Sequence, residues 1–219
     1  MERERICTKK SCFSFDTIKR LSLYLRNLKR LKEKGIEVIS SDRIIPLLNV
    51  SSAQFRKDLS YFGEFGKRGV GYEVGRLIKE LEEILGTNKE WKIALVGVGR
   101  LGQALLGFEG FSKFNIKIVC AFDIDKKKVG KVIEGVKVED MKKLKTIIKR
   151  KRVKIALLCT PPHSAQEVSE KLVAAGIRGI LNFSPLILKV PSSVFVSNVD
   201  MACELESLIF FLKRNERKV

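Results

Sequence analysis

Three glycines stand at the spacing of a loop that binds the phosphates of a dinucleotide. The run Gly97-Val98-Gly99-Arg100-Leu101-Gly102 directly follows an apolar segment and opens a segment with helical character. At this spacing the first glycine permits a tight turn, the second lets the backbone approach a pyrophosphate, and the third lets a helix pack closely on a strand. The free N–H groups at the start of the helix then face the phosphates. Residues 97–102 are therefore predicted to form a dinucleotide-binding loop.

An acidic residue follows this loop at the distance expected for a ribose contact. Asp123 ends the second apolar run, residues 116–123, and lies 21 residues after Gly102. A carboxylate at this position accepts hydrogen bonds from the adenosine ribose and repels a 2′-phosphate, which favours NAD(H) over NADP(H). Lysines 126–128 act against this preference. Two alternatives stay open: a domain of this fold that has lost its ligand, and one that binds another adenine ligand such as CoA.

Few residues could carry out catalysis. The single histidine, His163, follows Thr160-Pro161-Pro162 at the predicted end of a strand, where ligands bind in open α/β sheets. It is interpreted as a loop residue before a helix that Ser164 caps, with a catalytic histidine as the alternative. One histidine and five cysteines without a CxxC pair predict no metal site. The sequence therefore indicates a binding protein, and the rival hypothesis is an NAD-dependent enzyme with a basic helical appendage.

The charge of the chain favours a polyanionic partner. The chain has 43 basic and 25 acidic residues and a net charge of +18, an excess that favours nucleic acid. Its densest run, residues 142–154, holds eight basic residues and no acid. This run is interpreted as a solvated helix face, with a nucleic-acid contact as the alternative. Apolar runs are too short to span a membrane, no signal peptide is recognised, and the predicted location is a reducing cytoplasm.

A second group of polar and basic residues suits DNA. Segment 51–61 starts with a capping-box pattern that predicts a helix. The side chains suited to base edges and phosphates along it are Ser51, Ser52, Gln54, Arg56 and Lys57. Segment 63–72 has four glycines in ten residues, which predicts a tight hairpin with Lys67 and Arg68 at its tip, where a basic side chain can enter a minor groove. Both segments together suggest a winged helix-turn-helix, and the alternative is a small helical bundle with ordinary surface charge.

Helices and strands must hold the cofactor-binding and DNA-reading residues in place. The pattern of apolar residues changes near residue 90, from helical spacing to continuous runs. Helices are predicted before it from Asp16, as the cap, to Gly35, over 42–48 with Ser41 as the cap, over 51–61 and over 74–85. Buried parallel strands are predicted after it over residues 92–99, 116–123, 153–160 and 176–184. Helical segments between these strands, such as 164–176, complete a doubly wound α/β sheet.

The same residues carry a resemblance to a known family. The segments SSAQFRKDLSYFGEFGKRGVGY, VGVGRLGQALLGFEGF, AFDIDKKKVG, SAQEVSEKLVAAGIRGILNFSP, YLRNLKRL and NVDMACELESL resemble the Rex family of bacterial redox-sensing transcriptional repressors. The resemblance implies a winged-helix domain over 1–89, a Rossmann domain over 90–198, and a helix over 199–219 that is exchanged between the subunits of a homodimer. It also implies that NADH is a signal that releases the repressor from an inverted-repeat operator in double-stranded DNA.

The resemblance implies roles for individual residues. The dinucleotide would be bound by Gly97, Val98, Gly99, Arg100, Leu101, Gly102 and Asp123. The nicotinamide would be flanked by Thr160, Pro161, Asn182, Phe183 and Ser184, and by Met201 of the partner's exchanged helix. Arg26 and Asp200 would pair in the DNA-competent arrangement and act as a latch between two states. Phe108 stands where the family often has a tyrosine that meets the aspartate in the NADH-bound state, and phenylalanine has no hydroxyl for that contact.

Overall fold

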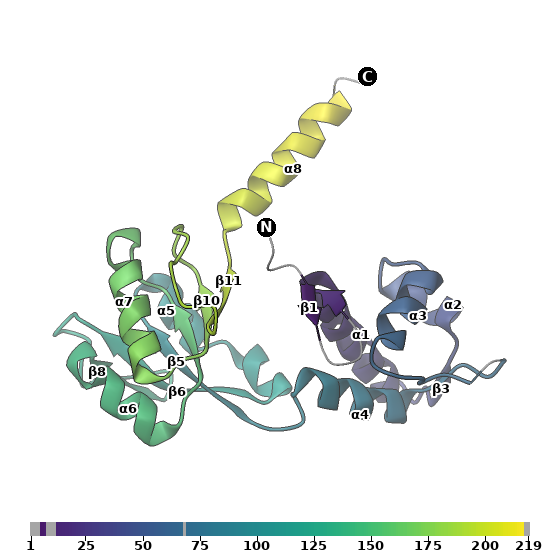
Figure 1. The fold of residues 1–219 in the computed structure, drawn as a ribbon, viewed down its shortest axis with the longest axis horizontal. Coiled ribbons are helices and arrows are strands. Elements are labelled where there is room, and N and C mark those ends of the chain that lie inside the picture. The colour runs from purple at the N-terminus through teal and green to yellow at the C-terminus, as the bar shows by residue number, and fades with distance from the viewer. Residues whose placement is uncertain (1–4, 8–11, 68, 217–219) are drawn as a thin grey trace. The chain divides into compact units, whose positions relative to one another are not determined.

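The chain folds into two compact units, one ending at Lys89 and one starting at Glu90 (Figure 1). A computed structural model describes residues 5–7, 12–67 and 69–216. Each unit has its own hydrophobic core. In this described part of the chain, no helix is both long and apolar enough to cross a bilayer.

The N-terminal unit consists of helices joined by short strands. Its elements are β1 (Arg5–Cys7), β2 (Cys12–Ser14), α1 (Phe15–Glu33), β3 (Val38–Ile39), α2 (Ser41–Ile44), the 3-10 helix η2 (Ile45–Leu47), α3 (Ser52–Ser60), β4 (Tyr72–Glu73) and α4 (Val74–Leu85). Strand β1 pairs with β2 and β3 pairs with β4, both antiparallel. Between α3 and β4 the backbones of Lys67 and Gly71 exchange two hydrogen bonds of 2.9 Å. The predicted hairpin is therefore confirmed, and with the helices it forms a winged helix.

Two predicted helix caps are wrong by one or two residues. Helix α1 is capped by Ser14, whose hydroxyl accepts a hydrogen bond of 3.2 Å from the backbone N–H of Thr17, whereas Asp16 lies inside the first turn. The residue that precedes α2 is Ser40, so that Ser41 is the first helical residue. The helix expected over 42–48 is split into α2 and η2, and Pro46 lies at the start of η2, where its missing N–H costs no helical hydrogen bond.

The core of the N-terminal unit fixes α3 against α1 and β4. Helix α1 buries one face, formed by Leu21, Tyr24, Leu25, Leu28 and Leu31. Phe55 of α3 is fully buried, and its ring packs edge-on against Tyr24 and Tyr72 with centroid distances of 4.8 and 5.4 Å. Aromatic pairs in this geometry add to the stabilisation that comes from burial. The predicted DNA-reading helix is thus held rigidly by the core beneath it.

The C-terminal unit is a doubly wound sheet. Its elements are β5 (Trp91–Val96), α5 (Arg100–Leu106), η3 (Glu109–Phe114), β6 (Ile116–Asp123), β7 (Val132–Ile133), β8 (Val136–Asp140), η4 (Met141–Lys143), α6 (Leu144–Lys151), β9 (Ile155–Leu158), α7 (Pro162–Ala175), β10 (Gly179–Asn182), β11 (Phe195–Asn198) and α8 (Met201–Glu216). The strand order is β11-β10-β9-β5-β6-β8-β7, and only the β7–β8 pair is antiparallel. The winding reverses between β5 and β9, so the loops that follow these two strands meet at a ligand-binding switch point.

The predicted strands are confirmed, and the start of one helix is corrected. Strands β5, β6, β9 and β10 occupy the four predicted apolar runs, β6 with the predicted bounds and the other three with shorter bounds, whereas β7, β8 and β11 were not predicted. Helix α7 begins at Pro162, so His163 is an exposed residue of its first turn and not a loop residue. Ser164 does not cap this helix, because its hydroxyl donates to the carbonyl of Pro161 at 3.1 Å.

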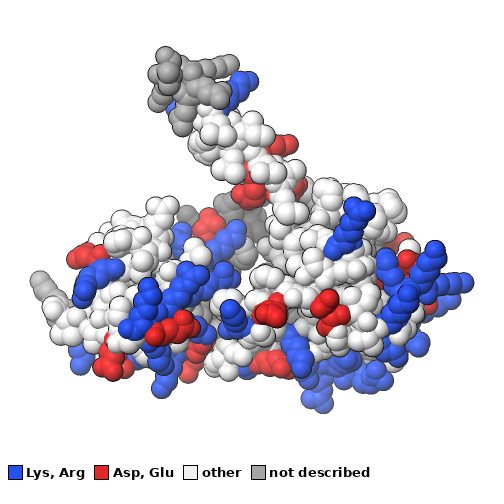
Figure 2. Space-filling model, turned by 180° about the vertical axis from the view of Figure 1, so that it is seen from behind, with Lys and Arg blue, Asp and Glu red and all other residues white. Residues whose placement is uncertain are grey.

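The basic run at 142–154 extends from η4 across α6 to the residues that precede β9, and half of its basic residues belong to α6. Helix α6 buries Leu144, Ile147 and Ile148, while Lys145, Lys149 and Arg150 are exposed. Figure 2 shows lysine and arginine side chains crowded along the lower edge of the C-terminal unit. The exposed charges and the buried apolar stripe agree with a solvated helix face.

The last helix, α8, leaves its apolar side chains uncovered in the single chain. These residues are 58–64% exposed: Leu205, Leu208, Ile209, Phe210, Phe211 and Leu212. A helix with this many exposed apolar residues is typical of an interaction surface. The exchange of this helix between subunits stays a prediction.

Candidate functional site

The glycine loop after β5 has the geometry that its spacing predicts. Gly97 has a φ of +94°, and a Cβ atom there would lie 2.5 Å from the carbonyl oxygen of Cys159. A Cβ atom on Gly102 would overlap the carbonyl oxygen of Gly97, so this glycine allows α5 to pack closely on the loop. A Cβ atom on Gly99 would meet nothing within 4 Å. The loop is therefore tightly packed at Gly97 and Gly102 and open at Gly99, where a phosphate needs room.

Asp123 ties the end of β6 to this loop. Its side chain is almost fully buried, and Oδ2 accepts a hydrogen bond of 2.8 Å from the backbone N–H of Val98. Oδ1 accepts a second bond of 2.8 Å from the backbone N–H of Asp125. The ammonium of Lys128 lies 3.4 Å from Oδ2. Each carboxylate oxygen has more than one acceptor site, so Asp123 keeps the capacity to accept a ribose hydroxyl while Lys128 partly balances its charge.

A cavity of about 530 Å³ opens beside the loop and Asp123. Five residues predicted to bind the cofactor line it: Gly97, Gly99, Asp123, Thr160 and Pro161. Lining residues that were not predicted to bind the cofactor include Ile124, Lys128, Met141 and Cys159, whereas Pro185 belongs to a loop that was predicted to flank the nicotinamide. The volume and the largely apolar walls are typical of a small-molecule site.

Two side chains that line the cavity, Thr160 and Cys159, indicate how it could contact a ligand. The hydroxyl of Thr160 is buried and has no hydrogen-bond partner among the described residues. A buried polar atom without a partner is costly unless a ligand or water satisfies it. Burial raises the pKa of the Cys159 thiol to about 12, so this sulfur is a neutral apolar wall and not a nucleophile. The open glycine, the buried acid and the hydroxyl together fit an adenine dinucleotide.

The remaining predicted residues of the loop lie around the cavity and not in its lining. Val98 is fully buried and packs in the core. Arg100 and Leu101 are the first two residues of α5, and Arg100 is exposed. An exposed arginine at the start of this helix is placed to meet a phosphate.

Asn182 has a structural role that the sequence did not reveal. Its amide nitrogen donates to the carbonyls of Ser184 and Leu186 at 3.1 and 2.8 Å, and to Oδ1 of Asn198 at 2.9 Å. Its amide oxygen accepts the backbone N–H of Ser184 at 3.0 Å. This fully buried side chain is therefore occupied in holding the loop after β10 to β11. Phe183 is half-buried next to it, and the buried hydroxyl of Ser184 has no partner among the described residues.

The predicted latch residues lie on different units. Arg26 is exposed on α1. Asp200 precedes α8, and its Oδ1 accepts the backbone N–H groups of Ala202 and Cys203 at 3.0 and 3.2 Å, as a helix cap does. The hydrogen bonds from the backbone lower the pKa of Asp200. The Arg26–Asp200 pair stays a prediction, as does the role of Met201, which is exposed in the single chain.

Five of the seven predicted DNA-reading residues lie on α3 or at its cap, but they differ in their environment. The capping half of the predicted box is confirmed, because the hydroxyl of Ser51 accepts the backbone N–H of Gln54 at 3.1 Å. The side chain of Gln54 does not return this bond, because its amide faces Asp58 instead. Ser52 and Gln54 are half-buried, whereas Arg56 and Lys57 are exposed.

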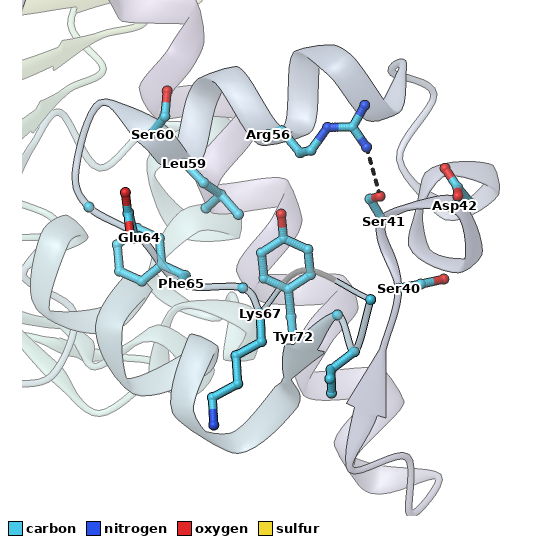
Figure 3. Close-up of a pocket in the computed structure, with 15 residues that line it drawn as sticks. Ser40, Ser41, Asp42, Arg56, Leu59, Ser60, Glu64, Phe65, Lys67 and Tyr72 are labelled. Carbon is cyan, nitrogen blue, oxygen red and sulfur yellow. Dashed lines mark hydrogen bonds between the residues drawn. The ribbon is translucent and has the colours of Figure 1, made fainter.

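A groove of about 550 Å³ lies between α3 and the hairpin (Figure 3). Arg56 reaches across it from α3, and its guanidinium donates to the hydroxyl of Ser41 at 3.1 Å. Lys67 is exposed on the hairpin and extends away from Arg56. Tyr72 forms part of the wall. Arg68, which the sequence places at the hairpin tip, lies outside the described residues.

A buried charge network joins α1 to α3, and the sequence analysis missed it. Asp58 is fully buried and accepts hydrogen bonds from Arg20, Tyr24 and Gln54 at 2.6–2.7 Å. Burial alone raises the pKa of Asp58, but these hydrogen bonds outweigh it, so the pKa lies below its usual value. Burial and the bond to Asp58 raise the pKa of Tyr24. A signal existed in the sequence: Arg20 with Tyr24, and Gln54 with Asp58, are each four residues apart, the spacing of one helix face.

The described residues contain no candidate metal centre, because no three His, Cys, Asp or Glu side chains gather among them. His163 is exposed on α7 and is not among the residues that line the cavity.

Two family models match the chain. The model described as "CoA binding domain" matches residues 88–186, and the model described as "Putative DNA-binding protein N-terminus" matches residues 14–60. The first covers the glycine loop, Asp123 and most of the sheet. The second covers α1 to α3.

Similar proteins of several bacteria are named redox-sensing transcriptional repressor Rex. The protein of Roseiflexus sp. (strain RS-1) is 43% identical over 198 residues, which cover 90% of both chains. The protein of Syntrophomonas wolfei is 45% identical over 201 residues, which cover 92% of this chain and 96% of the relative. The protein of Lactobacillus acidophilus is 44% identical over 196 residues, which cover 90% and 93%.

Solved structures of a repressor called RSP are similar over nearly the whole chain. The complex of RSP with β-NAD⁺ and operator DNA has a TM-score of 0.89 at 36% identity and covers 94% of this chain and 95% of RSP. The complex of RSP with β-NADH has a TM-score of 0.83 at 34% identity and covers 93% and 95%.

Proposed function

The chain belongs to the Rex family of redox-sensing transcriptional repressors, and from this premise we propose that it binds operator DNA and that NADH releases it. The open space at Gly99 beside the buried carboxylate of Asp123 is the observation that supports the proposal most directly. It provides a place for the pyrophosphate and the ribose of one dinucleotide. The same chain has the α3 surface and the basic hairpin that suit DNA.

The cofactor is NAD(H) in this proposal, although one family model is named for CoA. Asp123 favours a ribose with free hydroxyls, whereas CoA has a phosphate on its adenosine ribose that a buried carboxylate repels. The RSP complexes contain β-NAD⁺ and β-NADH. A competition experiment between NADH and CoA for the purified protein tests this choice, and displacement of NADH by equimolar CoA would contradict it.

Residues 1–89 would read DNA, residues 90–198 would bind the cofactor, and residues 199–219 would join two subunits. The exposed apolar side chains of α8 support a homodimer with an exchanged helix, since a partner would cover them. An inverted-repeat operator requires two reading helices about 34 Å apart, and a two-fold dimer supplies them. A repressor of bacterial genes would act in the cytoplasm.

The switch needs only a modest preference of NADH for the arrangement that does not bind DNA. A hundredfold preference corresponds to about 2.7 kcal/mol, which a buried nicotinamide and a few hydrogen bonds supply. The positive ring of NAD⁺ is costly beside apolar groups such as Phe183 and Met201, and this favours the neutral ring of NADH. Because Phe108 has no hydroxyl, the preference would not depend on a tyrosine at this position.

The proposal is tested by gel-shift titration of the full-length protein on a palindromic operator at fixed salt. NADH is expected to release the DNA at lower concentrations than NAD⁺. Equal effects of the two forms would contradict the redox-sensing role. Turnover of NADH with candidate carbonyl substrates would favour the enzyme hypothesis instead.

A further inference from the structure

The amide nitrogen of Gln54 is turned toward a buried carboxylate. Its Nε2 donates to Oδ1 of Asp58 at 2.7 Å. Asp58 has a lowered pKa and is ionised at neutral pH, so both of its oxygens only accept hydrogen bonds. The amide must therefore turn its nitrogen toward Asp58. An amide nitrogen has two hydrogens, so Oε1 and one N–H of Gln54 stay available.

Asp58 is held so firmly that it fixes this orientation. Its Oδ2 accepts from Nε of Arg20 at 2.6 Å and from the hydroxyl of Tyr24 at 2.7 Å. Its Oδ1 accepts from Nη2 of Arg20 at 2.7 Å as well as from Gln54. Arg20 is anchored in turn by a 3.2 Å bond from Nη2 to the hydroxyl of Thr17. A buried carboxylate with four such bonds has no freedom to rotate, because any rotation would leave a buried polar group unpaired.

The orientation of Gln54 determines which base suits it. Gln54 lies in the first turn of α3 and is half-buried, so its side chain is partly accessible to a ligand. In the major groove adenine presents the N6 donor and the N7 acceptor, which match Oε1 and one N–H of a glutamine. Guanine presents two acceptors there, O6 and N7. A carbonyl oxygen turned toward DNA repels O6, so the amide as Asp58 holds it selects adenine against guanine.

We propose that Gln54 reads an adenine in each half of the operator, and that Asp58, with Arg20 and Tyr24, is its positioning residue. The proposal rests on the DNA-binding function proposed above. Because the side chain is oriented before DNA arrives, less freedom is lost when the contact forms. The network also connects base reading to α1, since Arg20 and Tyr24 both belong to that helix.

The test selects sequences from duplex DNA with a randomised core, using the full-length protein. The bound pool is sequenced for the wild type and for the variants Gln54→Ala, Asp58→Asn and Lys57→Ala. In the wild type one A·T pair in each half-site is expected to be preferred over G·C by roughly 10- to 100-fold, the discrimination of a bidentate contact. Gln54→Ala is expected to flatten the preference at that pair and leave the other positions unchanged.

The other variants separate positioning from general binding. Asp58→Asn can turn an N–H toward Gln54, which releases its amide, so the same pair is expected to lose most of its preference. Lys57→Ala is the matched control on α3, because loss of a phosphate contact weakens all sequences alike. Tyr24→Phe removes one of the four bonds without a change of charge, and a partial loss at the same pair is expected. This variant decides the question if thermal unfolding reveals that Asp58→Asn does not fold.

The outcomes distinguish this proposal from the proposed function. If the wild type enriches no sequence, the DNA-binding function itself fails. If it enriches a palindrome that Gln54→Ala leaves unchanged at every position, or if the affected pair prefers guanine, only the assignment of Gln54 is overturned. If Gln54→Ala flattens one pair while the folded variants of Asp58 and Tyr24 leave it intact, the positioning role is overturned.

Discussion

The backbone N–H of Val98 donates a hydrogen bond of 2.8 Å to Oδ2 of Asp123. This bond joins the glycine loop after β5 to the end of β6, the neighbouring strand in the sheet. One carboxylate thus shapes the phosphate loop and lies where the adenosine ribose is expected. In the proposed site, this single side chain would couple the phosphate loop to the ribose position.

Asp123→Asn should weaken NADH binding by about 10- to 100-fold, because a hydrogen bond to a charged group contributes about 1.5–3 kcal/mol. Asparagine keeps one oxygen, which can accept from Val98 or from Asp125 but not from both, so a moderate fall in the unfolding temperature is also expected. Isothermal titration with NADH measures the affinity. Asp125→Asn, at the neighbouring half-buried acid, is the control and should bind NADH like the wild type. Equal affinities of Asp123→Asn and the wild type would exclude Asp123 from the ribose site.

Gly99→Ala should weaken NADH binding, whereas Gly102→Ala should lower the stability of the fold. The Cβ at 99 meets no protein atom and the backbone there is extended, so the variant should fold normally and bind NADH at least about tenfold more weakly. The Cβ at 102 overlaps the carbonyl of Gly97, so the variant should lose about 1–3 kcal/mol of stability. Thermal unfolding without cofactor, followed by NADH titration, separates the two. Normal NADH affinity in Gly99→Ala would show that no phosphate approaches this loop.

Features set by residues close in the sequence were predictable, and features set by distant packing were not. The glycine spacing determines the turn after β5 locally, and Gly86, with a φ of +68°, ends α4 as predicted. The cap of α1 depended on which of two short polar residues, Ser14 or Asp16, bonds the first turn. Both residue types cap helices, so the sequence alone favoured the wrong one.

The two side-chain networks required the packed structure. Arg20 and Asp58 are 38 residues apart and meet only because α1 and α3 pack together. Asn182 could be placed after a strand from its sequence, but the carbonyls that it holds belong to a loop and to β11, which had no clear pattern. The cavity residues Met141 and Lys128 were missed for the same reason.

Lys67→Ala should weaken DNA binding and reduce the salt dependence of the affinity. One lost phosphate contact lowers the slope of log K against log salt by about 0.9. Fluorescence anisotropy with a labelled operator at several salt concentrations measures this slope. Lys79→Ala, at an exposed lysine on α4, is the control of equal charge. The same slope for wild type and Lys67→Ala would remove the hairpin from the phosphate contacts.

Asp58 should make the stability of the protein sensitive to acid. Its pKa in the folded state lies below the unfolded value of about 3.9, so its contribution is present above that value and is lost as the pH falls toward the folded pKa. The difference in unfolding free energy between the wild type and Asp58→Asn should be constant from pH 5 to 7 and shrink below about pH 4. Urea unfolding across this range measures it, with the exposed Asp42→Asn as control. A difference that stays constant down to pH 2.5 would contradict the ionised network.

We propose that the reduced cofactor, bound at Gly99 and Asp123, releases DNA. The most direct measurement follows the anisotropy of a preformed operator complex as NADH or NAD⁺ is added, with the wild type and with Asp123→Asn. We expect NADH to release the DNA at a lower concentration than NAD⁺ does. The variant should need more NADH for release than the wild type, by the same factor by which its affinity for NADH is reduced. Release that does not depend on the oxidation state, or that is unchanged in a variant with weakened NADH binding, would contradict this proposal.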